Sequence, residues 1–119
     1  MPARTFRIHL TLTDPGRTDA QIQDEFDDLV TRACDGDRRA LAAIAIAFSS
    51  RLLGEARAEL GYFEQDADEV LQDFFAAVLE RQAVFDPAKE RANPWMKRIL
   101  RELARRRRAD RERDRGIEQ

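Results

Sequence analysis

The residues of this chain best suited to binding chemistry form two charged stripes, and the acidic stripe lies in residues 66–80. Written on a helix at about 100° per residue, this stretch puts its apolar side chains on one arc. The opposite arc carries Asp68, Glu69, Gln72, Asp73 and Glu80. Like charges four residues apart cost a helix about 0.2–0.5 kcal/mol per pair, and no Lys or Arg in 66–80 offsets that cost. The arc therefore indicates a surface for a basic partner, with a solvated helix face as the alternative.

The basic stripe lies in residues 93–108. Its apolar arc contains Trp95, Met96, Ile99, Leu100 and Leu103, and the other side carries Lys97, Arg98, Arg101, Arg105 and Arg108. Past Ala104 the apolar pattern stops, so we predict that the helix leaves the core there and projects basic side chains outward. A stripe of one sign beside a tryptophan favours binding to nucleic-acid phosphates over a merely solvated face.

The charge of the chain is divided between its two halves. The net charge is only −2, but residues 14–80 carry 16 acids and 6 bases, whereas residues 94–119 carry 10 bases and 5 acids. Such a polarised chain suggests one basic and one acidic partner. The alternative, that the two regions neutralise each other within the fold, is equally compatible with the charge alone.

Several function classes are excluded by composition. Cys34 is the single cysteine and His9 the single histidine, so one chain can build neither a disulfide, nor a zinc site, nor a His-based catalytic dyad. We therefore expect no cofactor, no metal and no enzymatic activity, and we assign Cys34 as a reduced structural thiol.

No run of eighteen apolar residues is present, and the start lacks the apolar core of a signal peptide. We expect a cytoplasmic protein without a membrane partner.

The hydrophobic periodicity predicts one all-α domain of about four helices. The helices are expected from Thr18 or Asp19 to Cys34, over 38–60, from Asp66 to about Gln82, and from Asn93 to Asp110 or beyond. Asp66 with Glu69 predicts a capping box, and Asn93 before Pro94 predicts an N-cap followed by proline at the first helical position. Gly61 is the expected stop of the second helix.

Four stretches in this order resemble region 2 of bacterial sigma factors, most closely the extracytoplasmic-function (ECF) group. They are FDDLVTRACDGDRRAL (26–41), DADEVLQDFFAAVLERQAVFDP (66–87), DPAKERAN (86–93) and NPWMKRILRELARRRR (93–108). The resemblance spans about residues 24–113. It implies a region 2 bundle over 18–113, with an N-terminal extension at 1–17 and a frayed tail at 114–119.

The resemblance implies a transcription initiation protein with two partners. In the family, the third helix docks on a coiled coil in the largest-subunit clamp of core RNA polymerase. By position this assigns polymerase binding to Asp68, Glu69, Gln72 and Asp73, with Asp66 at the edge. The loop 86–93 and the last helix contact promoter DNA at the −10 element, which assigns DNA binding to Lys89, Arg91, Asn93, Trp95, Lys97, Arg98, Arg101, Arg105 and Arg108. Trp95 is the candidate for stacking on a base, with core packing as its alternative, while Phe85 is assigned to the core.

Three departures from the family keep other functions open. Lys97 stands where the family commonly has an aromatic residue, and Glu102 stands where it commonly has Asn. The sequence ends at Gln119, and we expect no helix-turn-helix region 4. These features favour an interaction module, such as a decoy, a co-sigma or an anti-sigma target, that does not select promoters. A plain DNA-binding bundle is the third alternative. The expected partners therefore include an anti-sigma factor or a separate region 4 chain.

Residues 5–13 alternate between apolar and polar side chains, which predicts a short β-strand. No second strand is visible in the sequence, and a strand must pair its backbone groups. We expect a homodimer through residues 5–13 slightly more than addition to a partner's sheet. The alternatives are a disordered leader and an extended segment lying over the helices.

Overall fold

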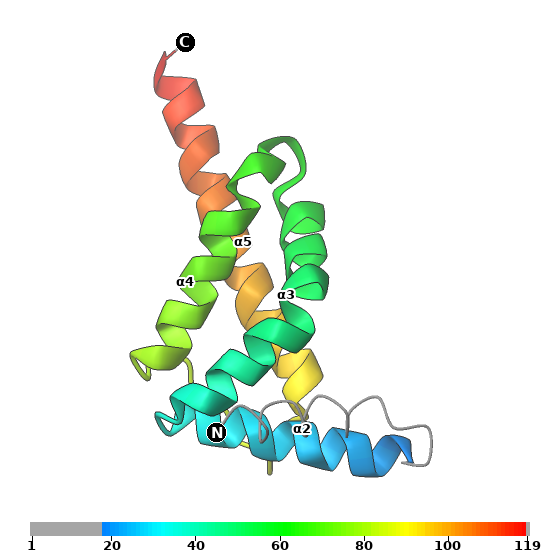
Figure 1. Cartoon of the computed structure of the whole chain (residues 1–119). Coiled ribbons are helices and arrows are strands. Elements are labelled where there is room, and N and C mark those ends of the chain that lie inside the picture. The colour runs from blue at the N-terminus through cyan, green and yellow to red at the C-terminus, as the bar shows by residue number, and fades with distance from the viewer. Residues whose placement is uncertain (1–17, 119) are drawn as a thin grey trace.

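The computed structural model describes residues 18–118, all of whose regular elements are helices. They are α2 (Asp19–Cys34), α3 (Arg38–Leu60), the 3-10 helix η1 (Gly61–Asp66), α4 (Ala67–Leu79) and α5 (Ala92–Glu118). α2 lies across one end of the bundle formed by α3, α4 and α5, and the C-terminal part of α5 projects beyond the other end (Figure 1). The all-α prediction is confirmed for the described residues, whereas the predicted strand and homodimer contact at 5–13 lie outside them. Within this part of the chain, no helix is both long and apolar enough to cross a membrane.

Local capping signals set the bounds of the first two helices. Thr18 caps α2 through a capping box with Gln21, in which each side chain accepts from the other residue's backbone N–H. Asp37 accepts from the N–H groups of Arg39 and Ala40 and so caps α3. Gly61 adopts a φ of +58° at the end of α3, a conformation that glycine enters without steric cost. The predicted bounds of both helices are confirmed.

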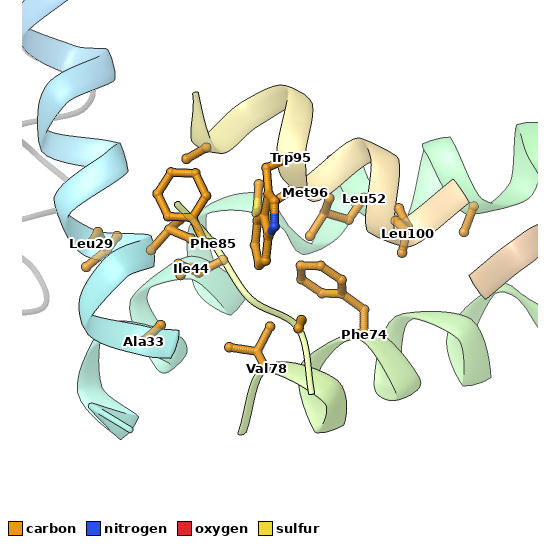
Figure 2. Close-up of a cluster of buried hydrophobic side chains, with 14 of the residues drawn as sticks. Leu29, Ala33, Ile44, Leu52, Phe74, Val78, Phe85, Trp95, Met96 and Leu100 are labelled. Atoms are coloured by element: carbon orange, nitrogen blue, oxygen red, sulfur yellow. The ribbon is translucent and has the colours of Figure 1, made fainter. Parts of the chain in front are cut away.

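The core joins all of the α-helices around Trp95. Its largest fully buried side chains are Trp95, Phe74, Leu29, Leu52, Leu60, Met96, Leu100, Val30 and Val70 (Figure 2). Burying an apolar side chain of this size contributes about 1.5–3 kcal/mol. Cys34 packs half-buried against this core, and burial raises the pKa of its thiol, which favours the unreactive protonated form. The core therefore fixes how α4 and α5 present their charged faces.

The helices at the two ends of the loop 80–91 differ from the prediction. α4 ends at Leu79 rather than near Gln82, and Arg81 follows with a φ of +60°. α5 continues to Glu118, where the sequence predicts fraying from residue 114. Distal contacts explain this length: Arg111 binds Asp66, and the Arg115 guanidinium lies 4.7 Å from the centroid of the Tyr62 ring. The distal part of α5 is therefore fastened to η1.

Candidate functional site

The acidic face of α4 consists of Asp68, Glu69, Gln72 and Asp73, and all four side chains are exposed. The opposite side of the helix buries Val70, Phe74 and Val78 in the core, as the periodicity predicts. Among the described residues, Asp68 and Asp73 form no ion pair. Glu69 alone of the four is paired, with Arg107 of α5. The acidic face thus presents two uncompensated carboxylates to solvent.

Asp66 was predicted to cap α4 and to border the acidic face, and its environment corrects the first of these predictions. Its side chain makes no capping hydrogen bond, and the residue is only 6% exposed. Arg111 Nε donates to Asp66 Oδ2 at 2.9 Å, and the Nε of Arg107 lies 3.9 Å from the same oxygen. A buried carboxylate requires such a cationic partner, because its desolvation is otherwise uncompensated. Asp66 therefore lies buried beside the acidic face and is bound to α5.

A cleft between α4 and α5 adjoins the acidic face. It is lined by Asp73, Ala76, Ala77, Glu80, Gln82, Leu103, Arg106, Arg107 and Asp110. Arg106 and Arg107 bring positive charge to a lining whose other charged residues are all acidic. Periodicity could not find this feature, since it depends on how the two helices lie against each other.

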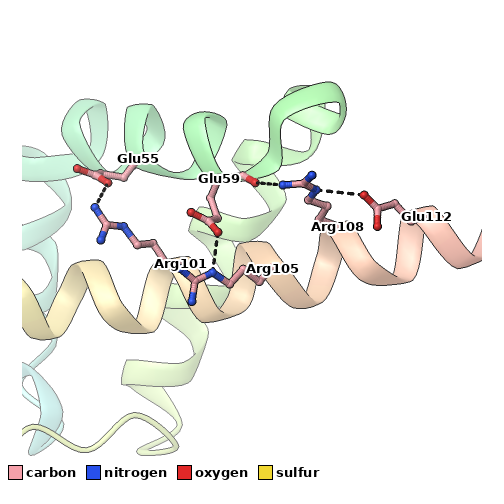
Figure 3. A network of polar contacts seen from close by, with 6 residues as sticks. All are labelled: Glu55, Glu59, Arg101, Arg105, Arg108 and Glu112. Carbon is pink, nitrogen blue, oxygen red and sulfur yellow. Dashed lines mark hydrogen bonds and ion pairs between the residues drawn. The ribbon is translucent and has the colours of Figure 1, made fainter.

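Most of the basic stripe of α5 is held by carboxylates of α3. Arg101 Nη2 lies 3.0 Å and Lys97 Nζ 3.8 Å from Glu55, and Arg105 Nε donates to Glu59 at 2.6 Å (Figure 3). Arg108 lies next in line, 3.1 Å from Glu112 and 3.4 Å from the backbone oxygen of Glu59. We call these residues the α3–α5 ladder: Lys97, Arg101, Arg105, Arg108, Glu55, Glu59 and Glu112. Sequence reasoning missed Glu55 and Glu59, whose spacing of four residues matches that of Arg101 and Arg105.

Arg98 lies outside the ladder. It donates to Glu90 at 2.8 Å and lies 3.6 Å from Glu102, the acid that departs from the family pattern. The hydrogen bond to Glu90 raises the pKa of Arg98 above its ordinary value. Glu102 therefore offsets a neighbouring arginine on the surface of α5.

The loop before α5 contains three basic residues, of which Arg81 donates to the backbone oxygen of Asp35 at 3.0 Å. Lys89 is exposed and has no ion pair within the described residues. Arg91 lies 3.0 Å from Asp24 and 3.2 Å from Asp27, both on α2. The loop is thus tied to α2, and among its basic side chains only Lys89 has neither an ion pair nor a hydrogen bond within the described part of the chain.

Asn93 does not cap α5, which corrects its predicted structural role. The helix begins at Ala92, whose N–H donates to Oδ1 of Asp27 at 2.7 Å. Asp27 of α2 therefore takes the place that the sequence assigned to Asn93. The Oδ1 atom of Asn93 is buried and accepts no hydrogen bond from residues 18–118.

Trp95 belongs to the core in this structure. It is 1% exposed, its Nε1 donates to the backbone oxygen of Val84 at 2.8 Å, and its ring centroid lies 5.2 Å from that of Phe85 (Figure 2). Phe85 is itself buried, as the sequence predicts. An indole ring this deeply buried cannot stack on a base in this conformation. The structure therefore agrees with core packing, the alternative role that the sequence offered for Trp95.

No group of three or more His, Cys, Asp or Glu side chains in the described part of the chain could hold a metal ion.

A family model described as Sigma-70 region 2 matches residues 44–114, which is more than half of the chain. The match covers most of α3 and all of η1, α4, the loop and the ladder residues. No curated protein and no solved structure matches the chain.

Proposed function

This chain belongs to the sigma-70 region 2 family, and we propose that it binds core RNA polymerase and promoter DNA as an ECF-type sigma-like initiation protein. The polymerase contact uses the acidic face of α4, and the DNA contact uses the loop 80–91 with α5. The polymerase supplies the chemistry, so the chain itself acts without catalysis. The helical domain extends to Glu118, beyond the residue 113 expected from the sequence, and we place the protein in the cytoplasm.

The observation that carries this proposal is the pair of uncompensated carboxylates on the acidic face. Asp68 and Asp73 are exposed and form no ion pair among the described residues, although the chain carries 21 Lys and Arg residues. An acidic surface of this kind steers and selects a basic partner. The clamp coiled coil that the family resemblance implies is the partner we assign to it, and Glu69 joins the contact when Arg107 releases it.

DNA binding is supported by the exposure of the basic residues. The side chains of Arg91, Arg98, Arg101, Arg105 and Arg108 are 43%, 48%, 45%, 64% and 51% exposed, so each guanidinium keeps an open side. Exposed ion pairs contribute only about 0–1 kcal/mol, so a phosphate can replace a carboxylate at low cost. Lys89 and Lys97 complete this surface. Trp95 acts through the core packing that holds this surface in place, and Asn93 is assigned to the DNA contact at the start of α5.

A second candidate function is a polymerase-binding module that does not select promoters. The α3–α5 ladder favours it, because Glu55 and Glu59 already take up much of the charge that a DNA strand would meet. A decoy, a co-sigma or an anti-sigma target would need only the acidic face. The two functions share polymerase docking and differ in DNA binding.

Co-purification of the chain with core RNA polymerase tests the shared step. We expect retention of the chain by immobilised core polymerase at low salt and its release as salt screens the contact. Binding of single-stranded and forked −10 DNA by the complex then separates the two candidates. A chain that is never retained by the polymerase contradicts both.

A further inference from the structure

The α3–α5 ladder is built in register. Glu55 and Glu59 are the only acidic residues of α3, and they stand four positions apart on the side that meets α5. Arg101 and Arg105, also four apart, lie opposite them at 3.0 and 2.6 Å. Residues at this spacing share one face of a helix, so two consecutive turns of α3 meet two consecutive turns of α5 (Figure 3).

Burial differs between the two sides of the ladder. The side chains of Glu55 and Glu59 are 25% and 24% exposed, whereas those of Arg101 and Arg105 are 45% and 64% exposed. The carboxylates therefore lie beneath and the guanidinium groups lie over them. Each of the two arginines reaches toward α3, where one side of its guanidinium group binds a glutamate and the other side is open to solvent.

The ladder nearly cancels its own charge. Its four positive side chains face three carboxylates, so the ladder has a net charge of +1, whereas its four cations alone would carry +4. Affinity for a nucleic-acid backbone depends on the phosphates that free cations can neutralise. The stripe consequently offers a phosphate less than its arginine content suggests.

We propose that Glu55 and Glu59 are positioning residues of the DNA surface, which hold Arg101 and Arg105 in place and lower their affinity for phosphate. A strand that binds α5 must share or displace these two carboxylates. The inference rests on the proposed DNA contact and adds residues of α3 to it.

The double variant E55Q/E59Q tests the proposal. Glutamine keeps an oxygen that accepts from each arginine and removes only the negative charge. Binding to single-stranded oligothymidylate is measured by titration across a series of salt concentrations. We expect about 2- to 30-fold tighter binding at low salt, which is the competition that two exposed ion pairs can exert. The slope of log affinity against log salt should steepen by about 0.7 for each phosphate newly contacted.

The charge-matched control is E64Q/E80Q. Glu64 and Glu80 are exposed and form no ion pair among the described residues, so this variant gains the same two units of charge away from the ladder. We expect a clearly smaller gain in affinity and an unchanged slope. The proposal is overturned if E55Q/E59Q matches this control, if it binds more weakly than the parent, or if neither it nor the parent binds.

Two further measurements keep the result unambiguous. If E55Q/E59Q loses its cooperative thermal transition, the single variants E55Q and E59Q are titrated, and each must steepen the slope by itself. R101A/R105A examines the DNA contact separately. Equal binding by R101A/R105A and the parent refutes the proposed DNA function, whereas equal binding by E55Q/E59Q and its control refutes only the role of the two glutamates.

Discussion

Asp27 of α2 caps α5 by accepting the backbone N–H of Ala92 at 2.7 Å, across 65 residues of sequence. The same carboxylate lies 3.2 Å from the guanidinium of Arg91. One buried side chain thus fixes where α5 begins and how the preceding loop lies. Together with the core packing of α5, this contact helps to set the position of the basic stripe.

Replacing Asp27 by alanine should lower the free energy of unfolding by about 1–3 kcal/mol, because the cap is lost and the N–H of Ala92 is left buried without an acceptor. D27N keeps an acceptor oxygen and should cost less. Urea denaturation followed by circular dichroism measures both. Equal stability of D27A and the parent would show that the cap contributes nothing.

Arg111→Ala should destabilise the protein by about 1–3 kcal/mol, since Asp66 then keeps only the more distant Arg107 as a cationic partner. The distal turns of α5 should also exchange their amide hydrogens faster. The matched control is Arg113→Ala, because Arg113 pairs with the exposed Asp110 at the helix surface. Similar effects of both variants on unfolding would refute the role assigned to Asp66.

Trp95 is the single tryptophan, so the tryptophan fluorescence of the protein measures the burial of this one ring. Its emission should lie at shorter wavelength in the folded than in the unfolded chain, and saturating single-stranded DNA should leave it unchanged, because the ring is 1% exposed. Trp95→Ala should cost about 3–5 kcal/mol through the cavity it leaves. Quenching of the emission by DNA would mean that the ring reaches a base and leaves the core.

Removing the guanidinium groups of Arg101 and Arg105 should weaken binding of the polymerase complex to forked −10 DNA. Each lost phosphate contact should flatten the salt dependence by about 0.7–0.9. The control is Arg57→Ala, which removes one exposed arginine of α3 that forms no ion pair among the described residues. An unchanged salt slope in R101A/R105A would favour the module that does not select promoters.

Local signals explain what the sequence could predict. The caps at Thr18 and Asp37 and the glycine at 61 act within a few residues, so the first two helices follow from the chain alone. The roles of Asp66 and Asn93 could not be predicted in this way. Each depends on a side chain that lies far away in the sequence, Arg111 for Asp66 and Asp27 for the start of α5.

The two charged stripes differ in how far the sequence alone predicts their state in the fold. The acidic face of α4 was predictable because its exposure follows from one helix and its apolar arc. The state of the basic stripe depends on Glu55 and Glu59, which belong to another helix and show no pattern of their own beyond their spacing. Charge alone could not distinguish an outward-facing stripe from one already neutralised within the fold.

The central claim is that the acidic face of α4 docks on core RNA polymerase, and charge reversal at Asp68 and Asp73 tests it most directly. D68K/D73K should retain its helicity by circular dichroism, because both side chains are exposed, and should lose co-purification with core polymerase. E64K/D114K reverses two other exposed acids, which form no ion pair with any residue that the structure describes, and should co-purify like the parent. Retention of folded D68K/D73K at the parent level would contradict the account and leave the acidic face as solvated surface.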